Sequence, residues 1–206
     1  MFDKIYKQFT AFISAKAFPW IFPFVLFVLY CIWMPNWFYN TVGWVDGWAY
    51  TGFFMDYPGL RSAFPHHPAG DLLSLLFPGV LFYQVFTPFW ANFLFKLCRF
   101  VLIGGMFFQF LKQQTGLRGA CLGVLLLLTA FPFIEAIRTD YTDGMTVFYL
   151  VGALFCFSSA YVRDTYKYVY LFLGGLFFAG SVTTTLLSLT LGVPFALFII
   201  MQQYYA

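Results

Sequence analysis

Residues 145–161 read MTVFYLVGALFCFSSAY, a run without a charged side chain. A helix that crosses the hydrocarbon core of a bilayer needs about 20 mostly apolar residues, so this run is a candidate membrane span. Similar runs occupy 18–36, 93–111, 119–135, 168–182 and 186–203. The sequence therefore predicts an all-α fold, a polytopic transmembrane helical bundle of about six spans that forms a single domain over residues 1–206.

The composition of the whole chain supports this prediction. Hydrophobic residues make up 62% of the 206 residues and charged residues only 9%, whereas soluble domains carry about 25% charged residues. So few charges cannot cover a surface that faces water, and we expect an integral membrane protein. The net charge is only +3 and no block of basic residues occurs, which argues against nucleic acid as a partner.

Basic residues and acidic residues are concentrated in different loops. Lys and Arg predominate in 1–16, 112–118 and 162–167, whereas Asp predominates in 37–92 and 136–144. Because short cytoplasmic loops collect Lys and Arg, we expect the N-terminus in the cytoplasm and the acid-rich segments on the outer face. The bacterial inner membrane is the preferred location, and an endoplasmic reticulum membrane with lumenal acid-rich segments fits the same topology.

Residues 72–90 are also apolar, but prolines and a glycine interrupt them. A crossing here would invert the topology downstream, so we expect an interfacial or re-entrant helix within the outer loop 37–92. The alternative is that 72–90 spans the membrane and that Lys96 and Arg99 are cytoplasmic. That arrangement leaves about a dozen residues for the next crossing, which is too few.

Two acid-containing motifs lie on the expected outer face, WVDGWAY at 44–50 and EAIRTDYTDG at 135–144. A carboxylate such as Asp46 can act as a general base, Asp143 can hold a divalent cation, and Arg138 can bind a phosphate through two parallel hydrogen bonds. Asp140 adds a further acid to the second motif. The alternative interpretation is that these residues are ordinary loop acids and helix caps.

His66 and His67 lie in a proline-bounded loop, FPHHP at 64–68. Adjacent histidines do not share one face of a helix, and a turn between prolines is typical of a solvated loop. A solvated turn is therefore the favoured interpretation. Contact of His67 with a substrate phosphate or a metal ion is the alternative.

The order of these motifs resembles the N-terminal half of the type C glycosyltransferases. These membrane enzymes use polyprenyl-phosphate sugars and include the protein O-mannosyltransferases and the lipid A aminoarabinose transferase. The family carries an aspartate motif, often D-E-x-x-Y, in a long outer loop after the first span. Here Asp46-Gly47-Trp48-Ala49-Tyr50 keeps the Asp and the Tyr and has Gly in place of Glu. A T-D motif opens a later helix in the family, and Thr142-Asp143 is similar to it.

The resemblance implies a membrane glycosyltransferase, or its N-terminal portion, that transfers a sugar from a polyprenyl-phosphate donor to an acceptor on the outer face. Asp46 would be the base that deprotonates the acceptor, and Asp143 would position the donor phosphate or a metal ion. The expected substrate-binding residues are Asp143, Asp140, Arg138, Tyr50 and His67. The cofactor stays open, with a divalent metal ion as one option.

Two other kinds of function fit the sequence less well. A non-catalytic transmembrane subunit of a larger membrane complex would have lipids and other subunits as partners, and the short chain with its 31 Phe residues favours it. A transporter or channel would need charges within its spans, and apart from Lys96 and Arg99 near one end of a span, and Glu135 at the edge of another, the predicted spans lack them.

Overall fold

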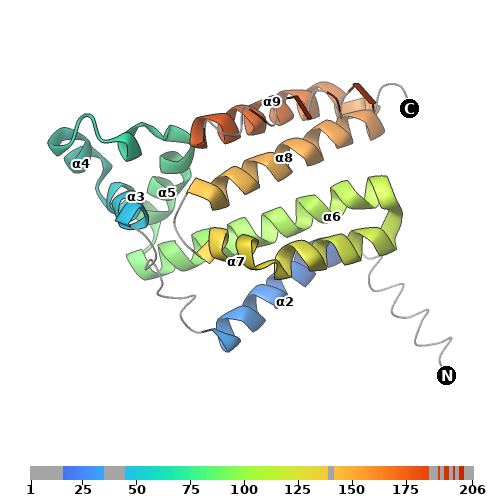
Figure 1. Ribbon diagram of the computed structural model, residues 1–206, viewed down its shortest axis with the longest axis horizontal. Coiled ribbons are helices and arrows are strands. Elements are labelled where there is room, and N and C mark those ends of the chain that lie inside the picture. The colour runs from blue at the N-terminus through green and yellow to red at the C-terminus, as the bar shows by residue number, and fades with distance from the viewer. Residues whose placement is uncertain are drawn as a thin grey trace.

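The computed structural model describes residues 16–34, 45–138 and 142–185, together with isolated positions between 190 and 201 (Figure 1). Of residues 45–48 and 164 it describes the backbone but not the side chains. Within this part of the chain the fold is all-helical, with no strand. The α-helices are α2 (Phe18–Trp33), α3 (Val45–Met55), α4 (Tyr57–Ala63), α5 (Leu73–Val85), α6 (Pro88–Thr129), α7 (Phe131–Arg138), α8 (Thr142–Val162) and α9 (Lys167–Thr184), and short 3-10 turns occur at η2 (Pro68–Asp71) and η3 (Asp164–Tyr166).

Helix α6 is a hairpin rather than one rod. Gly116 has φ 75° and ψ −174°, a backbone conformation that is open essentially to glycine alone. The outgoing arm (88–115) and the return arm (117–129) therefore lie side by side (Figure 1). A Cβ placed on Gly104 of the outgoing arm would come within 3.3 Å of Leu128 Cδ1 on the return arm.

We expect replacement of Gly116 by alanine to destabilise the protein through backbone strain alone. A Cβ on Gly116 would meet no atom within 4 Å, so no steric overlap contributes. Strain of this kind costs about 1–3 kcal/mol, which corresponds to a fall in Tm of a few degrees, about 2–4 °C per kcal/mol. The measurement is the thermal unfolding of the purified protein in detergent.

Gly175 in α9 provides the matched control, because a Cβ there also meets nothing within 4 Å and its backbone is helical. Alanine is a better helix former than glycine, so Gly175→Ala should leave Tm unchanged or raise it slightly. Equal Tm values for the two variants would contradict the strained turn at Gly116.

The helices follow the predicted spans closely in position but not in length. Helix α2 lies within 18–36, the outgoing arm contains 93–111, the return arm and α7 cover 119–135 between them, α8 contains 145–161 and α9 contains 168–182. The predicted span 186–203 lies mostly outside the described residues.

Among the described helices, only α6 and α8 are both long enough and apolar enough to cross a membrane, against the six spans predicted. Local features of individual helices explain why fewer of them are long enough to span a membrane. Helix α2 is apolar but has 16 residues. The return arm begins at the Gly116 turn and ends at Thr129, and α7 starts separately at Phe131 with Pro132 in its first turn. The runs of apolar sequence are continuous where the helices are not.

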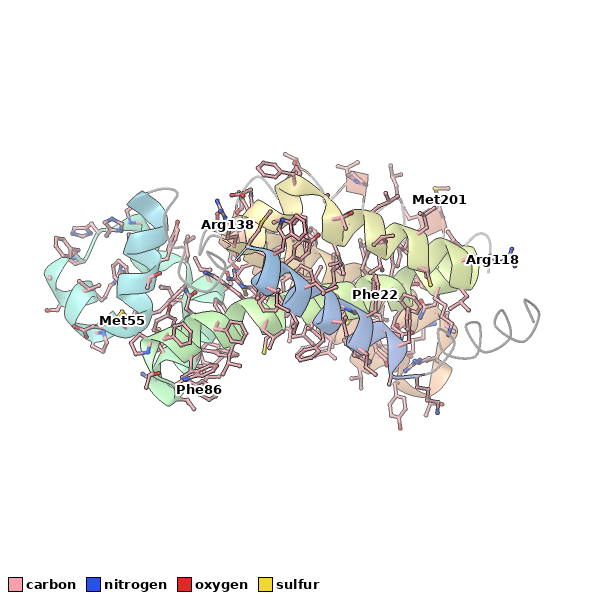
Figure 2. All side chains as sticks on the ribbon, turned by 90° about the horizontal axis from the view of Figure 1, so that it is seen from below. Phe22, Met55, Phe86, Arg118, Arg138 and Met201 are labelled. Carbon is pink, nitrogen blue, oxygen red and sulfur yellow. The ribbon has the colours of Figure 1, made fainter. Side chains whose placement is uncertain are left out.

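Aromatic side chains contribute to two buried clusters that meet along α6. The larger cluster joins α2, both arms of α6, α7 and α8, and includes Phe27, Phe100 and Phe133. The smaller cluster joins α3, η2, α5, the start of α6 and the start of α8, and includes Phe54 and Phe95. Figure 2 shows α3 and α4, with Met55, projecting beyond one end of the bundle, whereas Arg118 lies at the opposite end.

Candidate functional site

Two cationic side chains are buried in the outgoing arm of α6, where the two aromatic clusters meet. Lys96 is 0% exposed and Arg99 is 2% exposed. The two residues are three positions apart, which places them on neighbouring parts of one helix face. Lys and Arg are almost never fully buried in proteins unless an anionic group compensates them. A buried pair of cations within one helical turn is therefore an unusual feature of the described chain.

Arg99 extends from α6 to the junction of α7 and α8. Its guanidinium carbon lies 4.3 Å from the centroid of the Phe95 ring, which is a cation–π contact. On the far side, Arg99 Nη1 would lie 3.0 Å from a Cβ placed on Gly144, in the first turn of α8. The same Cβ would overlap the backbone oxygen of Ala136 in α7. The absence of a side chain at Gly144 therefore lets three helices close around the guanidinium.

The side chains of four carboxylates are described. Asp56 caps α4 by accepting a hydrogen bond from the Gly59 N–H at 3.1 Å. Asp71 forms an ion pair with Arg61 at 2.8 Å. Glu135 forms one with Arg138 at 2.8 Å, and Asp143 is exposed. The other acids of the sequence are Asp3, Asp46, Asp140 and Asp164.

Arg138 does not present the open guanidinium that the sequence motif suggested. It lies at the end of α7, and its Nη2 donates to Glu135 Oε2 one helical turn earlier. A cation at a helix C-terminus is also favoured by the helix dipole. The positive charge of Arg138 is thus partly neutralised within its own helix.

Asp143 occupies the first turn of α8, the position expected from the sequence. It is exposed and lines a groove of about 470 Å³ between the return arm, α7 and α8. The other polar side chain of the groove is Thr146, whose hydroxyl donates to the Thr142 carbonyl oxygen at 3.0 Å and lies 2.9 Å from the Thr185 hydroxyl. Apolar groups, among them Pro132 and Phe133, form the remaining walls.

His67 and Tyr50 have structural roles in this fold. His67 Nδ1 accepts a hydrogen bond from the Ala69 N–H at 3.2 Å, which caps the η2 turn. The His67 ring also contacts Phe53, with 5.7 Å between the ring centroids. This geometry agrees with the interpretation of FPHHP as a turn. Tyr50 is 9% exposed and packs within the aromatic cluster of α3 and α5.

The side chains of two expected site residues, Asp46 and Asp140, lie outside the described part of the chain. Asp46 lies in the first turn of α3, but its side chain is outside the described residues, and Asp140 is outside them entirely. Among the described side chains, no group of three or more His, Cys, Asp or Glu residues is arranged to hold a metal ion.

The burial of Lys96 and Arg99 was not predicted from the sequence. The sequence interpretation treated Lys96 and Arg99 as charges near the end of one span, although two cations three residues apart inside an apolar run are themselves a signal. Charges within membrane helices are rare and usually functional. That rule, applied to FLFKLCRF at 93–100, would have pointed to this site.

No protein-family model, no curated protein and no solved structure matches this chain. The likeness to type C glycosyltransferases therefore depends on the sequence motifs alone.

Proposed function

We propose that this chain is an integral membrane glycosyltransferase, or the N-terminal portion of one, that transfers a sugar from a polyprenyl-phosphate carrier to an acceptor on the outer face. The observation that carries the proposal is the buried cation pair, Lys96 and Arg99, beside the α8 turn that bears Asp143. A polyprenyl-phosphate donor has to place an anionic phosphate inside an otherwise apolar protein. Two buried cations supply the compensating charge.

The outer surface of the bundle supports membrane insertion. Large apolar side chains are exposed along the helices that face outward, including Ile32 at 73%, Leu126 at 61% and Phe172 at 67%. Soluble proteins rarely expose continuous apolar areas of this kind. Lipid is the solvent in which such a surface is stable.

The distribution of charge along the bundle supports the orientation. Exposed basic residues gather at one end, near the start of α2, at the α6 turn and between α8 and α9: Lys16, Lys112, Arg118, Arg163 and Lys167. The described acids lie toward the other end, where Figure 2 also has Arg138 and Met55. We assign the basic end to the cytoplasm, in a bacterial inner membrane.

Helix α5 fits the proposed interfacial helix. Its 13 residues extend about 20 Å at 1.5 Å per residue, which is less than the hydrocarbon thickness of about 30 Å. Leu73, Phe77, Leu81 and Val85, spaced four apart, are all more than half exposed. Such a stripe suits a helix that lies along the outer surface of the membrane.

The proposed reaction is a direct displacement at the anomeric carbon of the donor sugar. The acceptor oxygen forms a bond to this carbon as the bond between the carbon and the phosphate oxygen breaks. The electron pair of the broken bond leaves on the phosphate, where Lys96 and Arg99 stabilise the negative charge. Asp46 takes the proton of the acceptor hydroxyl as a general base.

Lys96 and Arg99 are better suited than Asp143 to bind the donor phosphate directly. Two anions repel each other, so Asp143 could position a phosphate only through a divalent cation between them. A phosphate held by the cation pair requires no such ion.

The test of the proposal is phosphate-dependent binding. Decaprenyl phosphate should raise the Tm of the wild-type protein in detergent, whereas decaprenol, which lacks the phosphate, should not. Arg99→Met and Lys96→Met should each weaken binding by about 10- to 100-fold, because a hydrogen bond to a charged group contributes about 1.5–3 kcal/mol.

Arg138→Met is the matched control, since it removes a cation whose charge Glu135 already balances. It should bind decaprenyl phosphate like the wild type. If either methionine variant fails to fold, decaprenyl phosphate binding is measured with Arg99→Lys instead, because this variant keeps the positive charge at the same site. Equal stabilisation by decaprenol, or undiminished binding by both methionine variants, would overturn the proposal and favour a non-catalytic membrane subunit.

A further inference from the structure

We infer that the groove beside Asp143 binds the acceptor, and that the acceptor is a membrane lipid whose head group carries a free hydroxyl. This inference depends on the proposed function, because it assigns the second substrate of the same reaction. It differs from the family expectation for Asp143, which was contact with the donor phosphate or a metal ion.

The lining of the groove defines the general chemistry of the ligand. Its walls come from the return arm of α6, from α7 and from α8, and apart from two side chains they are apolar. Thr146 is one of the two, and its hydroxyl is already engaged with Thr142 and Thr185. Asp143 is therefore the polar group that faces a ligand. A molecule that fits has an apolar chain and a polar end.

The charge of Asp143 selects the head group. A carboxylate accepts a hydrogen bond from a hydroxyl, and it repels a phosphate or a carboxylate. The effect is stronger beside apolar walls, where the local dielectric constant is low. The anionic donor is thus excluded from the groove, and a neutral hydroxyl-bearing end is favoured.

The position of the groove indicates that the ligand enters from the lipid. Phe131, 71% exposed, and Leu126, 61% exposed, belong to the same two segments that wall the groove. Pro132, which follows Phe131, lines the groove and is itself exposed, so the apolar surface proposed to face lipid reaches the groove. A lipid chain can reach it laterally without crossing water.

The groove and Arg99 meet where α7 packs against the start of α8. Ala136 and Asp143 line the groove, and a single Cβ position on Gly144 would contact both the Ala136 carbonyl oxygen and Arg99 Nη1. A hydroxyl at Asp143 and a phosphate at Arg99 would thus lie beside the same close helix contact. This arrangement brings an acceptor and a donor together while keeping their binding sites distinct.

Photo-crosslinking with two probes of equal chain length tests the inference. One is a diazirine-bearing hexadecanol and the other is the matching hexadecanoic acid, each added to the whole purified protein, with labelled peptides identified by mass spectrometry. The alcohol should label α7 and the start of α8 about tenfold more than the acid does, as one hydrogen bond to a charged group predicts. Asp143→Asn should remove most of this preference.

Ala130→Trp should reduce labelling by the alcohol severalfold by filling the groove, since Ala130 is one of its wall residues. Leu122→Trp is the matched control, because Leu122 is 59% exposed on the same return arm and is not part of the groove. It should label like the wild type.

Unchanged labelling in Ala130→Trp, or equal labelling by acid and alcohol in the wild type, would overturn the inference. Neither result depends on decaprenyl phosphate binding, so failure of this inference and failure of the proposed function are separately visible. Arg99→Met should lose donor binding and still be labelled by the alcohol.

Discussion

Replacement of Gly144 by alanine is expected to lower Tm by about 6–12 °C, the largest stability effect that we predict for a single methyl group. The added Cβ would overlap the Ala136 carbonyl oxygen and lie 3.0 Å from Arg99 Nη1. A side chain can rotate away from such an overlap, but a backbone carbonyl in a helix cannot. Helices α7 and α8 would have to separate, at a cost of about 3 kcal/mol.

Thermal unfolding in detergent measures this effect, and Gly175→Ala is again the appropriate control. Both changes add one methyl group to a glycine in a helix, but Gly175 has open space around it. The variant at Gly144 should also bind decaprenyl phosphate more weakly, because the same contact holds Arg99. Similar Tm values for Gly144→Ala and Gly175→Ala would show that α7 and α8 do not meet as described.

The all-helical fold was predictable because several of the longer helices contain long apolar runs. Residues 145–161 contain no charge, and α8 extends over Thr142–Val162. Asp143 at the first turn of that helix was also predictable, since carboxylates are favoured at helix N-termini. Both inferences use only neighbouring residues in the chain, where a pattern in the sequence directly reflects local structure.

The length of the helices was less predictable. A hydropathy pattern does not show that the chain reverses direction at Gly116, or that a new helix begins at Phe131. Among the described residues, only α6 and α8 are therefore both long enough and apolar enough to cross a membrane. Backbone breaks of this kind depend on single residues within otherwise uniform segments.

The candidate site was the hardest part to predict, because its geometry depends on contacts between distant segments. The ion pair of Arg138 with Glu135 is local, yet nothing in the motif shows that Arg138 is engaged rather than free for a phosphate. The approach of Arg99 to Gly144 joins residues 45 positions apart and depends on how three helices pack. Sequence patterns identify charges, whereas tertiary packing decides which of them are buried.

Asp46→Asn is expected to reduce sugar transfer by about 10²- to 10⁴-fold, the range typical for loss of a general base. Asparagine is nearly the same size as aspartate but does not take a proton from a hydroxyl. The expected effect is therefore on turnover, while decaprenyl phosphate binding at Lys96 and Arg99 should remain close to the wild-type value. The measurement is release of lipid phosphate from a panel of decaprenyl-phosphate sugars in the presence of hydroxyl-bearing lipids.

Asp56→Asn is the matched control for this experiment. Asp56 is another acid of the same acid-rich segment, but it caps α4 through Gly59, and asparagine is an equally good N-cap. Its variant should transfer sugar like the wild type. A large loss in Asp46→Asn with none in Asp56→Asn assigns the base to Asp46, because both changes remove one carboxylate charge from one segment. Equal losses would indicate a general electrostatic effect, and full activity in Asp46→Asn would exclude Asp46 as the base.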